Sequence, residues 1–272
     1  MSPAATLVEA LEPLRSDPAH AAVLLDIDGT LAPIVRHAAD AHVPEATRTL
    51  LIEISRRYRL VGCVSGRRAA TARQIVSIGS IAYVGNHGGE LLRPGATRPE
   101  ADPDVTAWSE RVGEFALRAY TPEVQRARVR SEDKQAIAAF HWRGAPDEPH
   151  AAELVRDIAR RAEEEGFAIH WGRKVLEVRP PVALDKGLGV TALLQSAAGG
   201  NGSALSGALY AGDDSTDIDA FRALRALVDA GTLRFAVCVA VASEETPREL
   251  AEQADLTIDG QGGVRGLLEA LL

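Results

Sequence analysis

The sequence predicts an α/β fold, with a mostly parallel sheet covered by helices on both faces and a smaller α+β unit inserted into it. In the first and last thirds of the chain, short apolar runs alternate with segments whose apolar residues recur at helical spacing. The middle third instead repeats a helix-strand-strand pattern twice, which is typical of an antiparallel sheet with its helices. We therefore expect a Rossmann-like core and an inserted α+β cap domain made of two helix-strand-strand units.

The predicted core begins with the apolar run Val23–Leu25, and Pro44 suits the first turn of the helix that follows it. The Gly/Ser/Ala-rich stretch 196–207 is expected to be a surface loop. In chain order, the pattern predicts strands over 23–25, 60–64, 81–84, 208–211, 235–241 and 256–258, and helices over 44–58, 67–78, 187–197, 216–228 and 264–272.

The predicted insert lies between two stretches that are rich in chain breakers, 93–103 and Pro180-Pro181. These limits predict a core over 1–98 and 182–272 and a cap over 99–181. Within the cap we expect a helix over 105–120, paired strands over 126–130 and 135–141 joined near 131–134, a helix over 151–165, and a second strand pair over 167–171 and 175–179.

Composition excludes several classes of protein. The 272 residues carry 30 basic and 38 acidic side chains, and a net charge of −8 argues against a nucleic-acid-binding protein. It does not argue against an anionic substrate, because a bound cation can invert the local field. Cys63 and Cys238 lie in apolar runs and are expected to be buried thiols without a disulfide. No apolar run approaches the length of a membrane span and no leader is evident, so we expect a soluble cytoplasmic protein.

Two aspartates directly after the first strand are the most informative feature of the sequence. Asp26 and Asp28 are expected at the carboxyl edge of the sheet, where open α/β folds bind their ligands. Such a pair can hold a hard cation, and one acid can attack phosphorus while the other transfers protons. A turn with two solvated acids is the alternative, but the preceding strand and the following Gly29-Thr30 favour a functional site.

Three further motifs lie at predicted strand ends or helix starts. Ser65 follows the second strand, where its hydroxyl can donate to a phosphoryl oxygen or cap a helix. Lys186 can neutralise a phosphate, although an exposed lysine is ordinarily a solvated charge. Asp213, Asp214 and Asp217 follow a late strand and repel one another, so a divalent cation is favoured over a polar turn.

The order of these motifs resembles that of the haloacid dehalogenase superfamily of phosphatases. The resemblance covers the core, roughly residues 20–95 and 182–272. It rests on the segments DIDGTL at 26–31, SGR at 65–67, DKG at 185–187 and GDDSTD at 212–217.

This resemblance implies Mg²⁺-dependent phosphoryl transfer. Asp26 would be the nucleophile that forms an aspartyl-phosphate, and Asp28 would protonate the leaving oxygen and then accept a proton from water. Asp26, the backbone carbonyl of Asp28, and Asp213 would hold Mg²⁺. The resemblance also implies that Asp217 and Asp214 support the metal from behind its direct ligands or through water, and that Thr30, Ser65 and Lys186 bind the transferring phosphoryl oxygens.

Within this superfamily the chain resembles the trehalose-6-phosphate phosphatases over nearly its whole length. The family more often carries an acidic residue where this chain has Ile218. Phosphatases of sucrose phosphate, mannosylglycerate phosphate or a hexose phosphate remain alternatives, as does a non-catalytic sugar-phosphate sensor. The resemblance rests on LLDIDGTLAPI at 24–34, GNHGGE at 85–90, EDK at 132–134, FHWR at 140–143, VLEVRP at 175–180 and GDDSTDIDAF at 212–221.

The same resemblance implies that the cap contacts the sugar hydroxyls through Glu132, Lys134 and Glu177. For the first two the alternative is a polar hairpin turn, and Glu177 in its strand can equally face solvent. A cap of this kind would close over the core edge, exclude water and recognise the leaving group.

Three more residues are candidates for the substrate site. Asn86 and His87 follow the strand 81–84 and are expected to line the cleft near the cap hinge, with a purely structural loop as the alternative. Arg67 is expected either to steer the phosphate or to form a salt bridge with the cap.

The expected partner is therefore a small-molecule sugar phosphate, with neither nucleic acid nor membrane. We expect a monomer. A functional link to a trehalose-phosphate synthase is left open by the sequence.

Overall fold

The computed structural model describes residues 3–35, 40–198, 205–244 and 246–272. The chain forms two compact units, with Met1–Glu100 and Leu184–Leu272 in unit 1 and Ala101–Ala183 in unit 2. The loop predicted over 196–207 falls in part on residues 199–204, which lie outside the described ranges.

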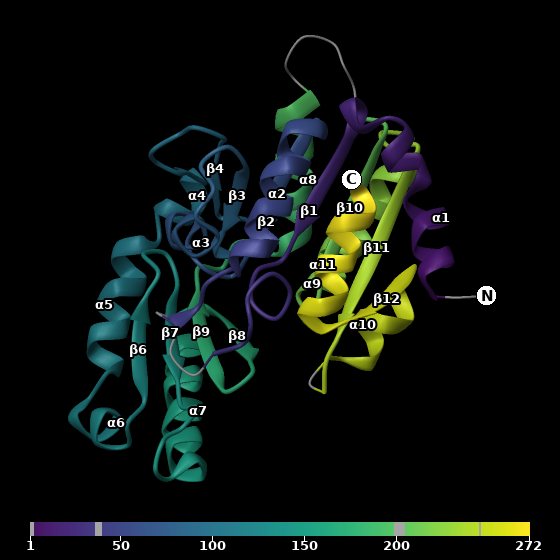
Figure 1. The fold of residues 1–272 in the computed structure, drawn as a ribbon. Coiled ribbons are helices and arrows are strands. Elements are labelled where there is room, and N and C mark those ends of the chain that lie inside the picture. The colour runs from purple at the N-terminus through teal and green to yellow at the C-terminus, as the bar shows by residue number, and fades with distance from the viewer. Residues whose placement is uncertain (1–2, 36–39, 199–204, 245) are drawn as a thin grey trace. The chain divides into compact units, whose positions relative to one another are not determined.

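Unit 1 is built on an eight-stranded sheet (Figure 1). From one edge to the other, its strands are β12 (Leu256–Asp259), β11 (Phe235–Ala242), β10 (Gly207–Gly212), β1 (Ala21–Leu25), β2 (Leu60–Val64), β3 (Ala82–Gly85), β4 (Glu90–Leu92) and β5 (Glu100–Ala101). The pairs from β12 to β3 are parallel, and β4 is antiparallel to β3. The central strands are buried throughout, which explains their continuous apolar sequence.

The order of the parallel strands places a ligand-binding position at the middle of the sheet. The chain runs outward from β1 through β2 to β3 and then returns to the other side of β1 with β10, β11 and β12. The order therefore reverses between β1 and β10, and open α/β sheets bind ligands beyond the carboxyl ends of the strands at such a point.

Helices cover both faces of this sheet, as predicted (Figure 1). One face packs against α1 (Pro3–Ser16), α2 (Glu45–Arg57), α3 (Ala69–Val76) and α11 (Gly260–Leu271). The other packs against α8 (Lys186–Ala198), α9 (Asp217–Asp229) and α10 (Arg248–Gln253). The α/β fold with a mostly parallel sheet is thereby confirmed. The helices α1 and α10 and the edge strands β4 and β5 were not predicted.

Unit 2 contains a four-stranded antiparallel sheet. Its elements are α4 (Pro103–Thr106), α5 (Ser109–Ala119), α6 (Pro122–Arg126), β6 (Arg130–Asp133), β7 (Ala138–His141), α7 (Glu148–Glu164), β8 (Ala168–Gly172) and β9 (Val175–Arg179), and the strand order is β6-β7-β9-β8. Phe140, Leu176 and Val178 join the apolar residues of α5 and α7 in a core of this unit's own. Because side chains alternate along a strand, Ala139 and Glu177 lie on the opposite face.

One predicted element of unit 2 is wrong. Of residues 126–130, predicted as a strand, Arg126 ends α6 and only Arg130 lies in a strand, as the first residue of β6. The rest of β6 occupies residues that were expected to form a turn. The helix begins because Pro122 fits the first helical position and the Thr121 hydroxyl accepts a hydrogen bond from the Val124 backbone N–H at 3.4 Å.

Two predictions from composition can be compared with the described residues. Cys63 and Cys238 are both buried and unbridged, as expected. Among the described helices, none combines the length and the apolar character that crossing a membrane requires.

Candidate active site

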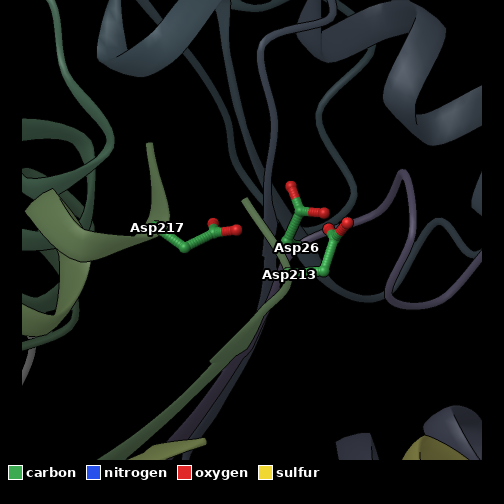
Figure 2. Close-up of side chains that lie close together, drawn as sticks. All are labelled: Asp26, Asp213 and Asp217. Atoms are coloured by element: carbon green, nitrogen blue, oxygen red, sulfur yellow. The ribbon is translucent and has the colours of Figure 1, made fainter. Parts of the chain in front are cut away.

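Asp26 and Asp213 lie at the point where the strand order reverses. Asp26 follows β1 directly and Asp213 follows β10, and the Asp26 backbone N–H donates to the Ala211 carbonyl at 2.8 Å. The two carboxylates are almost fully buried, and Figure 2 shows them next to each other, with Asp217 pointing toward them from the start of α9. One oxygen from each of the three side chains lies within 4.8 Å of the others. Three carboxylates in this arrangement fit a hard divalent cation such as Mg²⁺.

Two glycines allow the backbone to approach these carboxylates closely. Gly29 has a φ of +95°, and a Cβ on it would lie 2.1 Å from Oδ2 of Asp213. A Cβ on Gly212 would lie 2.2 Å from Cγ of Asp217. Any larger residue would displace a carboxylate. Thr30, which is fully buried, directs its hydroxyl toward Oδ1 of Asp213 at 3.5 Å.

Lys186 joins the acidic residues from the first position of α8. Its Nζ donates to Oδ1 of Asp26 and to Oδ1 of Asp217, each at 2.6 Å, and its side chain is 4% exposed. The alternative of a solvated lysine is therefore wrong. Burial alone lowers the pKa of Lys186, but Asp217 and Asp26 more than offset this and raise the pKa above its usual value. The lysine is thus a permanent cation.

The electrostatic balance at Asp26 leaves a role for a further cation. Burial raises the pKa of Asp26 well above its usual value, and Lys186 counters this only in part, while the charges of Asp217 and Asp213 raise the pKa further. A nucleophilic carboxylate must be ionised. A second positive charge beside Asp26 and Asp213 would favour the ionised form.

The Asp217 carboxylate is held by three donors. Its Oδ1 accepts from Lys186 and from the Tyr210 hydroxyl, both at 2.6 Å, and its Oδ2 accepts from the Asp214 backbone N–H at 2.8 Å. The Asp214 side chain instead accepts from the hydroxyl and backbone N–H of Ser215, at 2.9 and 2.5 Å. Asp217 therefore organises the turn that carries Asp213.

Arg67 contacts Asp28, an arrangement that the sequence did not predict. Its Nε donates to Oδ2 of Asp28 at 2.6 Å and its Nη2 donates to Oδ1 at 2.7 Å. The two side chains are partly buried, with 16% of Arg67 and 34% of Asp28 exposed. A fork of two parallel hydrogen bonds fixes both the position and the orientation of a carboxylate.

Ser65 lies at the end of β2 and is buried. Its Oγ accepts from the Arg67 backbone N–H at 3.1 Å. The helix-cap alternative is wrong, because α3 begins at Ala69 and its N-cap residue is Arg68. Ser65 thus belongs to the turn that positions Arg67.

Asn86 and His87 form a strained turn directly after β3. Both are buried and both adopt left-handed backbone conformations, with φ of 48° and 53°. Such conformations are unfavourable for residues other than glycine and concentrate at functional sites. Asn86 donates to Oε1 of the buried Glu90 at 3.0 Å. The His87 ring packs against Gly66 so closely that a Cβ on Gly66 would lie 2.6 Å from Cε1 of His87.

The three predicted sugar-binding residues of unit 2, Glu132, Lys134 and Glu177, belong to two polar groups of its sheet. Lys134 Nζ donates to Oε1 of Glu177 at 2.6 Å, and Arg179 donates to Oε2 from Nε and Nη2 at 2.9 and 2.5 Å. Glu132 Oε2 lies 2.9 Å from Nε2 of His141. The turn alternative for Glu132 is wrong because the residue lies in β6.

Some residues of these networks were missed by sequence reasoning. Tyr210 lies in an apolar strand, and its partner Asp217 is seven positions away in the sequence. Arg179 lies in a segment in which only Glu177 was predicted to bind the sugar. The available signal for both was a polar side chain in a segment predicted to be buried, since buried polar groups require partners.

Comparisons with known proteins found both similar sequences and similar folds. The sequence profile of the family described as Trehalose-phosphatase matches residues 24–254. "Probable trehalose-phosphate phosphatase G" of Arabidopsis thaliana is 29% identical over 224 residues, covering 75% of this chain and 58% of that protein. The chain spans little more than half the length, or less, of the first curated relatives that it matches.

Solved structures with the same fold include two from Candida albicans. The C-terminal domain of its trehalose-6-phosphate phosphatase has a TM-score of 0.76 and 21% identity, covering 98% of this chain and 96% of that chain. The C-terminal domain of its trehalose synthase regulatory protein has a TM-score of 0.68 and 13% identity, covering 97% of each chain. At these identities the likeness shows the shared fold.

Proposed function

The chain belongs to the trehalose-phosphatase family, and on this premise we propose that it hydrolyses trehalose 6-phosphate to trehalose and phosphate. The observation that carries the proposal is the convergence of Asp26, Asp213 and Lys186 at the point where the strand order reverses. An anionic ester binds poorly to bare carboxylates, so the site needs positive charge in addition to Lys186.

Mg²⁺ is the proposed source of that charge, and Asp26, Asp213 and the backbone carbonyl of Asp28 would hold it. When bound, Mg²⁺ stabilises the negative charge that develops on the phosphoryl oxygens. Asp217 is proposed to support the site from behind, because both its oxygens already accept hydrogen bonds from the protein.

In the first step, an oxygen of Asp26 attacks phosphorus and the bond from phosphorus to the sugar oxygen breaks. Asp28 gives its proton to the departing sugar oxygen. Lys186, whose Nζ lies beside the attacking carboxylate, would stabilise the transferring phosphoryl group together with Thr30 and Ser65.

In the second step, water attacks the phosphorus of the aspartyl-phosphate. Asp28 takes the proton from this water, and the bond to Asp26 breaks to release phosphate. Arg67 donates to both oxygens of the Asp28 carboxylate, an arrangement that favours the ionised form needed to take a proton from water in the second step. For the first step one of these two hydrogen bonds has to open so that this oxygen can carry the proton, and we propose that the other bond keeps Asp28 aimed at the reacting atoms.

The proposed sugar site is the polar face of unit 2, with Glu132, Lys134 and Glu177 as hydroxyl-binding groups. Carboxylates and an ammonium group are apt partners for a disaccharide, which offers many hydroxyls and no charge beyond its phosphate. Asn86 and His87 are proposed to line the substrate cleft. We further propose a monomeric cytoplasmic enzyme.

A non-catalytic sugar-phosphate sensor is the second candidate. It is favoured by one observation, the likeness of the fold to the C-terminal domain of a trehalose synthase regulatory protein. It is disfavoured by the buried Asp26–Lys186 pair, because a sensor has no use for a nucleophile held at 2.6 Å from a permanent cation. A functional link to a trehalose-phosphate synthase is compatible with either candidate.

The test is phosphate release from purified protein, with Mg²⁺ or with chelator, against trehalose 6-phosphate, sucrose 6-phosphate, glucose 6-phosphate and mannosylglycerate phosphate. We expect release with Mg²⁺ and none with chelator, and a preference for the trehalose ester. Asp26→Asn should abolish release and still bind the ester. Equal rates on mono- and disaccharide esters would contradict the substrate assignment, and binding without release by the parent protein would identify a sensor.

A further inference from the structure

We infer that Tyr210 is a positioning residue for phosphoryl transfer, acting through Asp217 to fix the ammonium group of Lys186. This inference rests on the proposed function and assigns a role to a residue outside the four sequence motifs. Tyr210 lies in β10, two positions before Gly212, and is fully buried.

The geometry begins with a single carboxylate oxygen. Oδ1 of Asp217 accepts from the Tyr210 hydroxyl and from Lys186 Nζ, both at 2.6 Å. Burial and the neighbouring carboxylates raise the pKa of Tyr210 well above its usual value, so the phenol remains a donor. Because the Tyr210 hydroxyl occupies one acceptor position of this oxygen, the Lys186 ammonium group is held at the other.

The Tyr210 ring is itself fixed. It packs edge-to-face on Phe221, with ring centroids 6.0 Å apart and an interplanar angle of 80°. Phe221 lies in α9, one turn beyond Asp217, and both rings belong to the apolar cluster under α8 and α9. The Tyr210 hydroxyl thus connects β10 to Asp217 at the start of α9 and, through Asp217, to Lys186 at the start of α8.

The consequence concerns Lys186, which bridges Asp217 and the proposed nucleophile Asp26. Without the hydroxyl, the Asp217 carboxylate loses one of its three donors and can rotate toward Lys186. The ammonium group would then shift away from Asp26. Because stabilisation of a transition state depends on groups fixed in advance, such a shift lowers the rate of transfer more than it weakens substrate binding.

Tyr210→Phe tests the inference, and Tyr83→Phe is a matched control. Tyr83 is also fully buried in the same sheet, and its hydroxyl donates at 2.5 Å to the Ile78 carbonyl. For Tyr210→Phe with Mg²⁺ and trehalose 6-phosphate, we expect kcat to fall about 10-fold and KM to change by less than about threefold. Tyr83→Phe should leave both within about twofold, with a similar change in Tm.

A double-mutant cycle identifies the route of the effect. In an Asp217→Asn background, Tyr210→Phe should cause less than about a twofold further loss of kcat, because the two residues act as a unit. Wild-type kcat in Tyr210→Phe, or an undiminished 10-fold loss in the Asp217→Asn background, would overturn the inference. If Tyr210→Phe does not fold, Phe221→Leu carries the test, and a kcat equal to wild type in that variant would likewise overturn it.

A binding measurement separates this inference from the proposed function. With Mg²⁺ present, calorimetry should show inorganic phosphate binding about threefold more weakly to Tyr210→Phe than to the parent or to Tyr83→Phe. This comparison holds even if the parent protein releases no phosphate from trehalose 6-phosphate, a result that would contradict the proposed function alone. If Tyr210→Phe bound phosphate as tightly as the parent protein, the role of Tyr210 in fixing Lys186 would be contradicted.

Discussion

At the scale of single residues, the site concentrates charge where burial opposes it. Asp26, Asp213, Asp217 and Lys186 are all nearly inaccessible to water, and three of the four are acidic. The pKa of Asp26 is raised although Lys186 lies 2.6 Å away, so one cation does not balance the group. Burying these charges costs stability, a cost that proteins commonly bear at functional sites.

Asp26→Asn should therefore stabilise the cation-free protein. A carboxyl whose pKa is raised by folding is destabilising when ionised, and this cost appears as pH rises through its unfolded pKa of about 3.9 and is complete above the folded pKa. At pH 7 in chelator, Asn avoids the cost, and Tm should rise by about 2–4 °C for each kcal/mol recovered.

Thermal unfolding with chelator and with Mg²⁺ measures both parts of this prediction. Mg²⁺ should raise the Tm of the parent protein, and Asp26→Asn should lose most of that rise. The exposed Asp229→Asn is the control, because surface substitutions usually change stability by less than about 0.5 kcal/mol. A lower Tm for Asp26→Asn in chelator would contradict the argument.

At the scale of elements, the junction between β10 and α9 sets the distances in the site. Gly212 ends the strand, and Asp217 begins the helix and turns back to lie over that glycine. This contact fixes how closely the helix can approach the strand.

Gly212→Ala should disrupt this junction. A Cβ there would lie 2.2 Å from Cγ of Asp217, so the carboxylate and its partner Lys186 must move, and we expect at least about a 10-fold loss of phosphate release. Gly266→Ala is the matched control, because Gly266 lies inside α11 with no atom within 4 Å of its added Cβ. The control should keep its activity and gain about 0.5–1 kcal/mol in free energy of unfolding. Equal activity in the two variants would show that the contact is not needed.

Sequence reasoning succeeded where a single element carries the signal. The buried strand before Asp26 is apolar throughout, and the acids after it could be assigned to the carboxyl edge from that pattern alone. The strand predicted over 126–130 was wrong because alternating polar and apolar residues there favoured a strand. Thr121 and Pro122 instead begin a short helix, which ends at Arg126. Pairs such as Arg67 with Asp28, 39 positions apart, depend on how separate elements meet, which no local pattern encodes.

At the scale of the whole molecule, the proposed sugar-binding residues and the proposed catalytic residues lie in different units, each with its own apolar core. Unit 2 has an apolar cluster of its own, and unit 1 has one on each face of its sheet. We therefore expect that the proposed sugar-binding residues can be changed without disturbing the proposed catalytic residues.

Glu132→Gln should weaken recognition of the sugar alone. We expect KM for trehalose 6-phosphate to rise about 10-fold, because one charged hydrogen-bonding group is lost, with little change in hydrolysis of p-nitrophenyl phosphate. The stability of the protein should change little, because Glu132 is 41% exposed and its contact with His141 is screened by water.

Asp133→Asn is the control, because Asp133 is the next residue of β6 and its side chain points to the other face. It should leave KM unchanged. A parallel loss on both substrates in Glu132→Gln would show that the residue serves the reaction rather than the sugar.

The pairing of β1 also has a consequence for synthesis. One neighbour, β2, follows β1 within 40 residues, but the other, β10, begins only at Gly207. While the ribosome is still making the intervening chain, the backbone N–H and C=O groups along one edge of β1 have no strand to pair with. Together with the exposed apolar side chains of β1, this unpaired edge favours association with other chains. The nascent protein also holds Asp26 long before Lys186 and Asp213 are synthesised, so the proposed site cannot form before the last third of translation.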